Sequence, residues 1–134
     1  MENKTNFELI TPSQRMISQE IEMVVIPGSE GHFGVLPLHA HTLSTLNRGI
    51  VTLYENGSSI DNVIIDGGIA DVTPSGCSIL VERAENLNDL KQSEIQNRLN
   101  NFKNKEKSFE NPAEEKANSD EIDWLEFVLS KIKD

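Results

Sequence analysis

The three histidines of the chain, His32, His39 and His41, lie close together and are the first residues that could perform chemistry. Imidazole nitrogens bind zinc and related metals, and two histidines separated by one residue on a strand face the same side. No Asp, Glu or Cys completes a tight cluster with them, because Glu30 lies in turn-like sequence. We therefore expect these histidines to lie at the surface and to bind no metal.

Glycines mark two further stretches that could bind a ligand, residues 28–34 and 66–68. A phosphate loop needs a following helix whose N-terminal amides face the anion. Strand-like sequence follows both stretches, so we expect the glycines to shape turns and bulges instead. These loop-shaping residues are Gly28, Gly31, Gly34, Gly67 and Gly68.

Nucleophilic catalysis is not indicated elsewhere in the chain. Ser44, Ser75 and Cys77 do not combine with a histidine in a recognisable pair of nucleophile and base. We expect no catalytic residue and no cofactor.

The charge of the chain limits the partners that it can have. Its 134 residues include 12 basic and 22 acidic side chains, which gives a formal net charge of −10. Nucleic acids and anionic lipid surfaces require concentrated positive charge, so neither is an expected partner. The single cysteine suits a reducing compartment. No apolar run is long enough to span a membrane, so we expect any membrane association to be indirect, through another protein.

The composition divides the chain into a strand-rich part, residues 1–86, and a helical part, residues 87–134. Short β-branched runs separated by Gly and Pro predict an antiparallel sandwich or barrel for the first part. In residues 20–26 the alternation places Ile21, Met23 and Val25 on one face and Val24 on the other. The expected strands are 7–11, 20–26, 41–46, 50–55, 59–66, 68–72 and 77–82.

The second part changes to helical periodicity and predicts a two-helix hairpin. Ile95, Leu99 and Phe102 recur at the spacing of one helix face. Asp89 followed by Gln92 resembles a capping box at the start of the first helix. Residues 111–114 offer a second helix start, and the final apolar stripe is expected to begin afresh near Ser119.

One extended pattern resembles a known family. It reads G-S-E-G-x-x-G-[apolar]-x-P-x-H-A from Gly28 to Ala40 and continues with glycines and apolar residues as far as Val72. This pattern resembles the epsilon subunit of F-type ATP synthase, which is called delta in mitochondria. The resemblance implies a ten-stranded β-sandwich followed by a C-terminal helical hairpin.

The resemblance also implies a role without catalysis. Epsilon subunits belong to the rotor of the central stalk, where they bind the gamma subunit and the ring of c subunits and couple rotation to ATP synthesis. In bacteria this places the protein at the cytoplasmic face of the inner membrane, attached through the complex. In many bacteria the tail can also extend along gamma, contact the alpha and beta subunits and inhibit ATP hydrolysis. The final helix here carries the acidic residues Glu121, Asp123 and Glu126, so we expect weak or absent inhibition by the tail. As the alternative we keep a small metal-dependent enzyme with a cupin-like sandwich and the three histidines as ligands.

Specific residues acquire expected roles from this resemblance. Glu30, His32 and His39 would be polar contacts to the c ring, and Pro37 would help the nearby glycines to set the backbone. ATP-binding members of the family carry [Ile/Leu]-Asp-x-x-Arg-Ala at the start of the first tail helix. Here Lys91 replaces the Asp and Glu94 replaces the Arg, so we expect no nucleotide binding.

Overall fold

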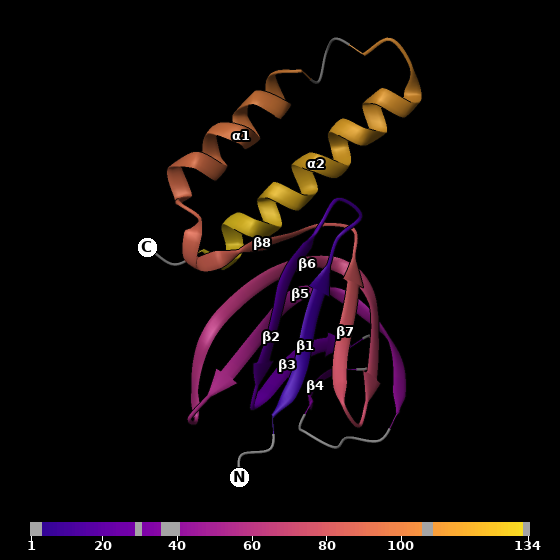
Figure 1. Ribbon diagram of the computed structural model, residues 1–134. Coiled ribbons are helices and arrows are strands. Elements are labelled where there is room, and N and C mark those ends of the chain that lie inside the picture. Colours follow the sequence, from indigo (N-terminus) through magenta and orange to yellow (C-terminus); the bar gives the residue numbers. More distant parts are fainter. Residues whose placement is uncertain (1–3, 29–30, 36–40, 106–108, 133–134) are drawn as a thin grey trace. The chain divides into compact units, whose positions relative to one another are not determined.

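The first unit of the chain, Met1–Asn88, is a strongly curved β-sheet that encloses its own core (Figure 1). The computed structural model describes residues 4–28, 31–35, 41–105 and 109–132. Within these residues the sheet has eight strands, in the order β2-β1-β7-β6-β5-β3-β4, with β8 paired to β6. The strands are β1 (Thr5–Ile10), β2 (Arg15–Ile21), β3 (Met23–Gly28), β4 (Gly31–Val35), β5 (Thr42–Glu55), β6 (Ser58–Thr73), β7 (Gly76–Val81) and β8 (Ala84–Asn86).

The strand count differs from the implied ten because two expected turns are absent from the described residues. β5 runs for 14 residues and β6 for 16, each where the sequence predicted two shorter strands. At the expected turn in β5, Arg48 donates from Nε to Asp66 Oδ1 of β6 at 2.7 Å and keeps the strands paired. Next to it, a Cβ added to Gly49 would lie 2.8 Å from Cβ of Pro27, so this glycine permits close packing within the sheet.

β6 bends in its middle at the pair Gly67 and Gly68. Their φ angles are 72° and 147°, a region that side chains disfavour. On one side of the bend β6 pairs with β8, at Val63–Ile65, and on the other side it pairs with β7. The bend therefore lets one long strand pair with β8 on one side of the bend and with β7 on the other, within the curved sheet of Figure 1.

The core of the first unit lies between the layers of this folded sheet. Among the described strands, β1 and β7 pair in parallel and the other pairs are antiparallel. The curved sheet buries one face and leaves the other to solvent, which gives a β-sandwich. The buried cluster is Phe7, Leu9, Ile21, Val24, Ile26, Leu46, Val51, Leu53, Val63, Ile65, Ala70, Val72, Cys77, Ile79 and Val81.

The predicted faces of residues 20–26 are wrong beyond Ile21. β2 ends at Ile21 and β3 begins at Met23, with a bend at Glu22 between them. The bend shifts the alternation by one residue, so Val24 is buried and Met23 is only half-buried. Glu22 itself accepts a hydrogen bond from the backbone N–H of Asn56, in the turn between β5 and β6.

The second unit, Asp89–Asp134, contains the two expected helices, α1 (Gln92–Asn104) and α2 (Pro112–Lys131). Asp89 does not cap α1, because Leu87–Asp89 form a 3₁₀ turn and Lys91 occupies the N-cap position. The predicted start of α2 is confirmed: the Asn111 side chain accepts from the backbone N–H of Glu114 at 2.8 Å, with Pro112 as the first helical residue.

α2 does not restart near Ser119 but continues without a break. Asn118 is buried there and donates from Nδ2 to the Phe102 carbonyl at 3.1 Å, so it joins α2 to α1. The polar sequence around Asn118 predicted a connection between helices, but the structure places Asn118 within α2 as a hydrogen-bonded residue. Across the described part of the chain, neither helix combines the length and apolar character that a membrane crossing needs.

Candidate functional site

One end of the sandwich gathers the strand ends that flank the family pattern, and we call it the loop end. β3 ends there at Gly28, which pairs with Gly31 at the start of β4. β5 begins there opposite Val72, and the β6–β7 turn closes with Thr73 opposite Gly76. Glu30, Pro37 and His39 lie outside the described residues.

The described part of the β3–β4 hairpin presents His32 to solvent. His32 lies in β4 opposite Pro27, and its side chain is exposed. Gly31 has a φ of 126° with no atom within 4 Å of an added Cβ, so its role is in the backbone turn. Gly34 lies against the Met23 side chain, whose sulfur would be 3.3 Å from an added Cβ.

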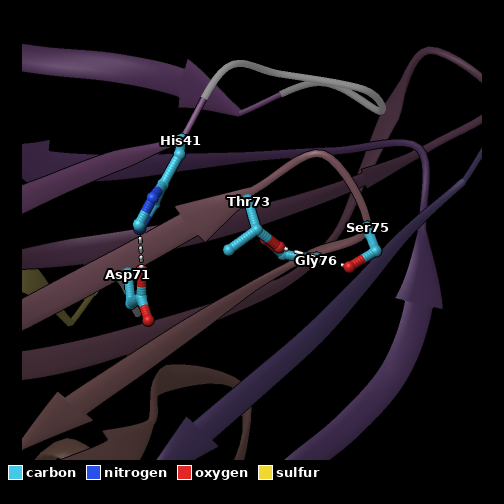
Figure 2. A network of polar contacts seen from close by, with 5 residues as sticks. All are labelled: His41, Asp71, Thr73, Ser75 and Gly76. Carbon is cyan, nitrogen blue, oxygen red and sulfur yellow. Dashed lines mark hydrogen bonds and ion pairs between the residues drawn. The ribbon is translucent and has the colours of Figure 1, made fainter.

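His41 is paired with a carboxylate at the loop end (Figure 2). Its Nε2 lies 3.0 Å from Oδ1 of Asp71 on β6, and Asp71 pairs across the sheet with Leu43. Both side chains are exposed, so the pair contributes at most about 1 kcal/mol to stability. Its effect is to tie the start of β5 to the neighbouring strand.

The β6–β7 turn beside this pair is closed by its own side chains (Figure 2). Thr73 donates from Oγ1 to the Gly76 carbonyl at 3.3 Å, and Thr73 Oγ1 lies 3.2 Å from Oγ of Ser75. Short polar side chains of this kind stabilise tight turns. The described part of the loop end is thus held by several local contacts.

Metal and nucleophilic chemistry find no support in the described residues. Within the ranges that the structure describes, no group of three or more His, Cys, Asp or Glu side chains could hold a metal ion. Cys77 is buried in β7, and burial together with the negative charge of Asp71 raises its pKa to about 12. It therefore remains a protonated thiol, which is a poor nucleophile.

A second candidate surface lies on the outer face of β1, β7 and β6. Leu80 of β7 pairs across the sheet with Ile10 of β1 and with Ile69 of β6, and we call these three residues the apolar stripe. Leu80 is 52% exposed and Ile69 is 48% exposed. The three residues of the stripe line a groove of about 520 Å³ together with Thr11, Pro12, Gly68, Val81 and Glu82.

The apolar stripe was not among the predicted site residues. Ile69 and Leu80 occupy strand positions that alternate with buried residues, where an outer sheet face is normally polar. The signal in the sequence is that each of two separate strands carries an apolar residue at a position where the alternation predicts a side chain facing solvent. Only the strand register shows that these residues are neighbours. Contiguous exposed apolar side chains of this kind mark protein interaction surfaces.

Comparison with known proteins identifies the family. Residues 4–87 match the family described as ATP synthase, Delta/Epsilon chain, beta-sandwich domain. The ATP synthase epsilon chain of Granulibacter bethesdensis is 38% identical over 96 residues, which cover 72% of this chain and 71% of that one. The ATP synthase epsilon chain of Rhodospirillum rubrum is 37% identical over 99 residues, which cover 74% of each chain.

The fold of the chain is similar to that of a chain of known structure. A chain in the structure of the Euglena gracilis mitochondrial ATP synthase, OSCP/F1/c-ring, superposes with a TM-score of 0.71 at 20% identity. The superposition covers 99% of this chain and 84% of that one, so the similarity of fold extends beyond the sandwich. The resemblance found in the sequence is thereby confirmed, and the chain belongs to the delta/epsilon-chain family of ATP synthases.

Proposed function

We propose that this chain is the non-catalytic epsilon subunit of the rotor of a proton-translocating F-type ATP synthase. In this role it binds the gamma subunit and the c ring and couples ring rotation to ATP synthesis in the catalytic head. The observation that carries the proposal is the apolar stripe on a sandwich of this family, because a subunit of a rotary shaft must adhere firmly to its neighbours. The protein acts at the cytoplasmic face of the bacterial inner membrane and is peripheral through the complex.

The apolar stripe is the proposed contact with gamma. Ile69 and Leu80 offer branched apolar side chains on a rigid sheet, with the groove that they line to receive a partner side chain. Apolar anchors in the centre of an interface supply most of its binding free energy, and surrounding polar groups exclude water. Thr11 and Glu82 at the groove can supply part of that polar rim.

The loop end is the proposed contact with the c ring. Glu30, His32 and His39 are the proposed polar contacts, and Pro37 and the neighbouring glycines set the backbone that presents them. A joint that transmits torque needs a stiff surface. The β3–β4 ladder, the His41–Asp71 pair and the closed β6–β7 turn support that requirement.

A variant with Glu30→Ala and His39→Ala tests the c-ring contact. We expect ATP-driven proton pumping by the assembled complex to fall several-fold relative to its ATP hydrolysis, because the polar contacts no longer resist slip at the joint. Both activities are measured on the same membrane vesicles. The control is Glu20→Ala, an exposed carboxylate of β2, which should change neither activity. Equal loss of pumping and hydrolysis would contradict the proposed role.

We propose residues 1–86 as the domain that assembles with gamma and residues 87–134 as a separable helical domain. A chain that ends after Asn88, which retains all of the first unit, is expected to fold and to bind purified gamma with an affinity within about tenfold of the full chain. Circular dichroism checks folding, and calorimetry measures affinity. A truncated chain that is folded but does not bind gamma would show that the hairpin is required.

The helical domain is proposed to contact the alpha and beta subunits without binding a nucleotide. Lys91 lies at the N-cap of α1 and Glu94 in its first turn, so a carboxylate occupies the position where phosphate recognition would need arginine. Titration of MgATP into the full chain up to millimolar concentration is expected to give no saturable heat. Saturable binding that Lys91→Ala abolishes would contradict this prediction.

A further inference from the structure

The segment that joins the two units is held to the sandwich by one carboxylate, Asp61 of β6. Its Oδ1 accepts a hydrogen bond from Asn86 Nδ2 at 2.8 Å and another from Asn88 Nδ2 at 3.1 Å. The backbone N–H of Asn62 donates to the same oxygen at 3.1 Å. One oxygen of Asp61 therefore gathers three donors, two of which belong to the last residues before the second unit.

The two asparagines are also tied to each other. The backbone N–H of Asn88 donates to Oδ1 of Asn86 at 2.8 Å. The Asn86 side chain therefore accepts a hydrogen bond through its oxygen and donates another, to Asp61, through its nitrogen. This arrangement closes a ring of hydrogen bonds around the end of β8. An ionised carboxylate accepts stronger hydrogen bonds than a neutral group, so Asp61 is the central member of the ring.

The backbone pairing of this segment is short. β8 consists of Ala84–Asn86 and pairs only with Val63–Ile65 of β6 among the described residues. Beyond it the chain passes through the 3₁₀ turn Leu87–Asp89 to the N-cap of α1 at Lys91. A strand of three residues has few backbone hydrogen bonds, so side-chain contacts add to its pairing with β6 and to the packing of Ala84 against the core.

We propose that Asp61, Asn86 and Asn88 form a clasp that fixes the point at which the helical unit leaves the sandwich. With the clasp closed, residues 84–88 follow β6 and the helical unit starts from a fixed point. With the clasp open, these residues detach while the sandwich remains folded, and the helical unit gains freedom to change its position. The clasp is thus a release point built from residues of this chain.

Amide hydrogen exchange on the full chain tests the clasp. In Asp61→Ala we expect the protection of amides in residues 84–88 to fall roughly tenfold, the change that follows loss of a hydrogen bond to a charged group. Protection in β1, β5 and β7 should stay as in the wild type. The matched control is Asp71→Ala, which removes a carboxylate from the same strand β6 at its exposed pair with His41.

The double variant Asp61→Ala with Asn88→Ala shows whether Asp61 and Asn88 act together as a clasp or stabilise residues 84–88 independently. If Asn88 acts through Asp61, the double variant loses no more protection than Asp61→Ala alone. Additive losses, or unchanged protection of residues 84–88 in Asp61→Ala, would overturn the proposal. Equal loosening of the whole sandwich would also overturn it, because Asp61 would then be a general stabilising residue.

A distance measurement tests the consequence for the helical unit. Spin labels at Ser58→Cys and Ser119→Cys, two exposed positions in different units, report the spread of distances between the units. Asp61→Ala is expected to broaden this distribution, and Asp71→Ala to leave it unchanged. A distribution that Asp61→Ala does not alter would show that the clasp does not restrain the hairpin.

Discussion

A chain with Gly68→Ala is expected to lose about 3 kcal/mol or more of its free energy of unfolding. Gly68 has a φ of 147°, and a Cβ at this position would lie 2.1 Å from the Leu80 carbonyl oxygen and 2.9 Å from a methyl carbon of Val81. The first of these atoms belongs to the backbone of β7, so the clash cannot be relieved by a side-chain rotation. Urea unfolding of the full chain, followed by circular dichroism, measures the loss.

Gly57→Ala is the matched control for this experiment. Gly57 also has a positive φ, 76°, but no atom lies within 4 Å of an added Cβ. Its substitution therefore introduces backbone strain without a clash and should cost about 1–2 kcal/mol. The difference between the two variants reflects the close approach of β7 to the bend in β6 together with the larger positive φ of Gly68, which lies farther from the left-handed helical region. Equal losses would mean that this approach does not constrain the sandwich.

The second large effect is expected at the apolar stripe. A chain with Ile69→Asp and Leu80→Asp should bind gamma roughly 100-fold more weakly, because two apolar anchors become charges that the interface would have to desolvate. Both side chains are about half exposed in the isolated chain, so its free energy of unfolding should change by only about 0.5–1 kcal/mol. Calorimetric titration with purified gamma gives the affinity, and urea unfolding gives the stability.

Ile60→Asp provides the control for the stripe. Ile60 lies on the same strand as Ile69 and is 47% exposed, against 48% for Ile69, but it is not part of the stripe. A charge at Ile60 should leave gamma binding within about threefold of the wild type. If Ile60→Asp weakens binding as much as the stripe variant does, gamma does not recognise the stripe specifically.

Local patterns in the sequence predicted the class of fold and several of its details. The Asn111-Pro112 start of α2 follows from capping chemistry confined to a few neighbouring residues, and the structure confirms it. The helix faces marked by Ile95 and Leu99 depend only on helical periodicity, and both side chains are buried. Features of this kind require no knowledge of which strand or helix lies nearby.

The incorrect predictions concern features that depend on distant residues. The sequence 47–49 has the composition of a turn, yet the pairing of Arg48 with Asp66 continues the strand. The faces of β3 depend on the bend at Glu22, whose carboxylate is fixed by the backbone of Asn56. The apolar stripe, which was not predicted at all, likewise exists only through the register of three strands. In each case the structure depends on a residue far along the chain, and local sequence propensity carries no information about that residue.

The parallel pairing of β1 with β7 has a consequence for folding during synthesis on the ribosome. Phe7, one of the buried core residues, lies beside Cys77, so β1 is synthesised well before β7, its neighbour in the sheet. Until β7 has emerged, β1 can pair only with β2, and its other edge stays open to solvent and to other chains. Closing such a long loop of chain is slow, because the entropy must be lost before the contact forms. We therefore expect the sandwich to complete its folding late in synthesis, after β7 has emerged.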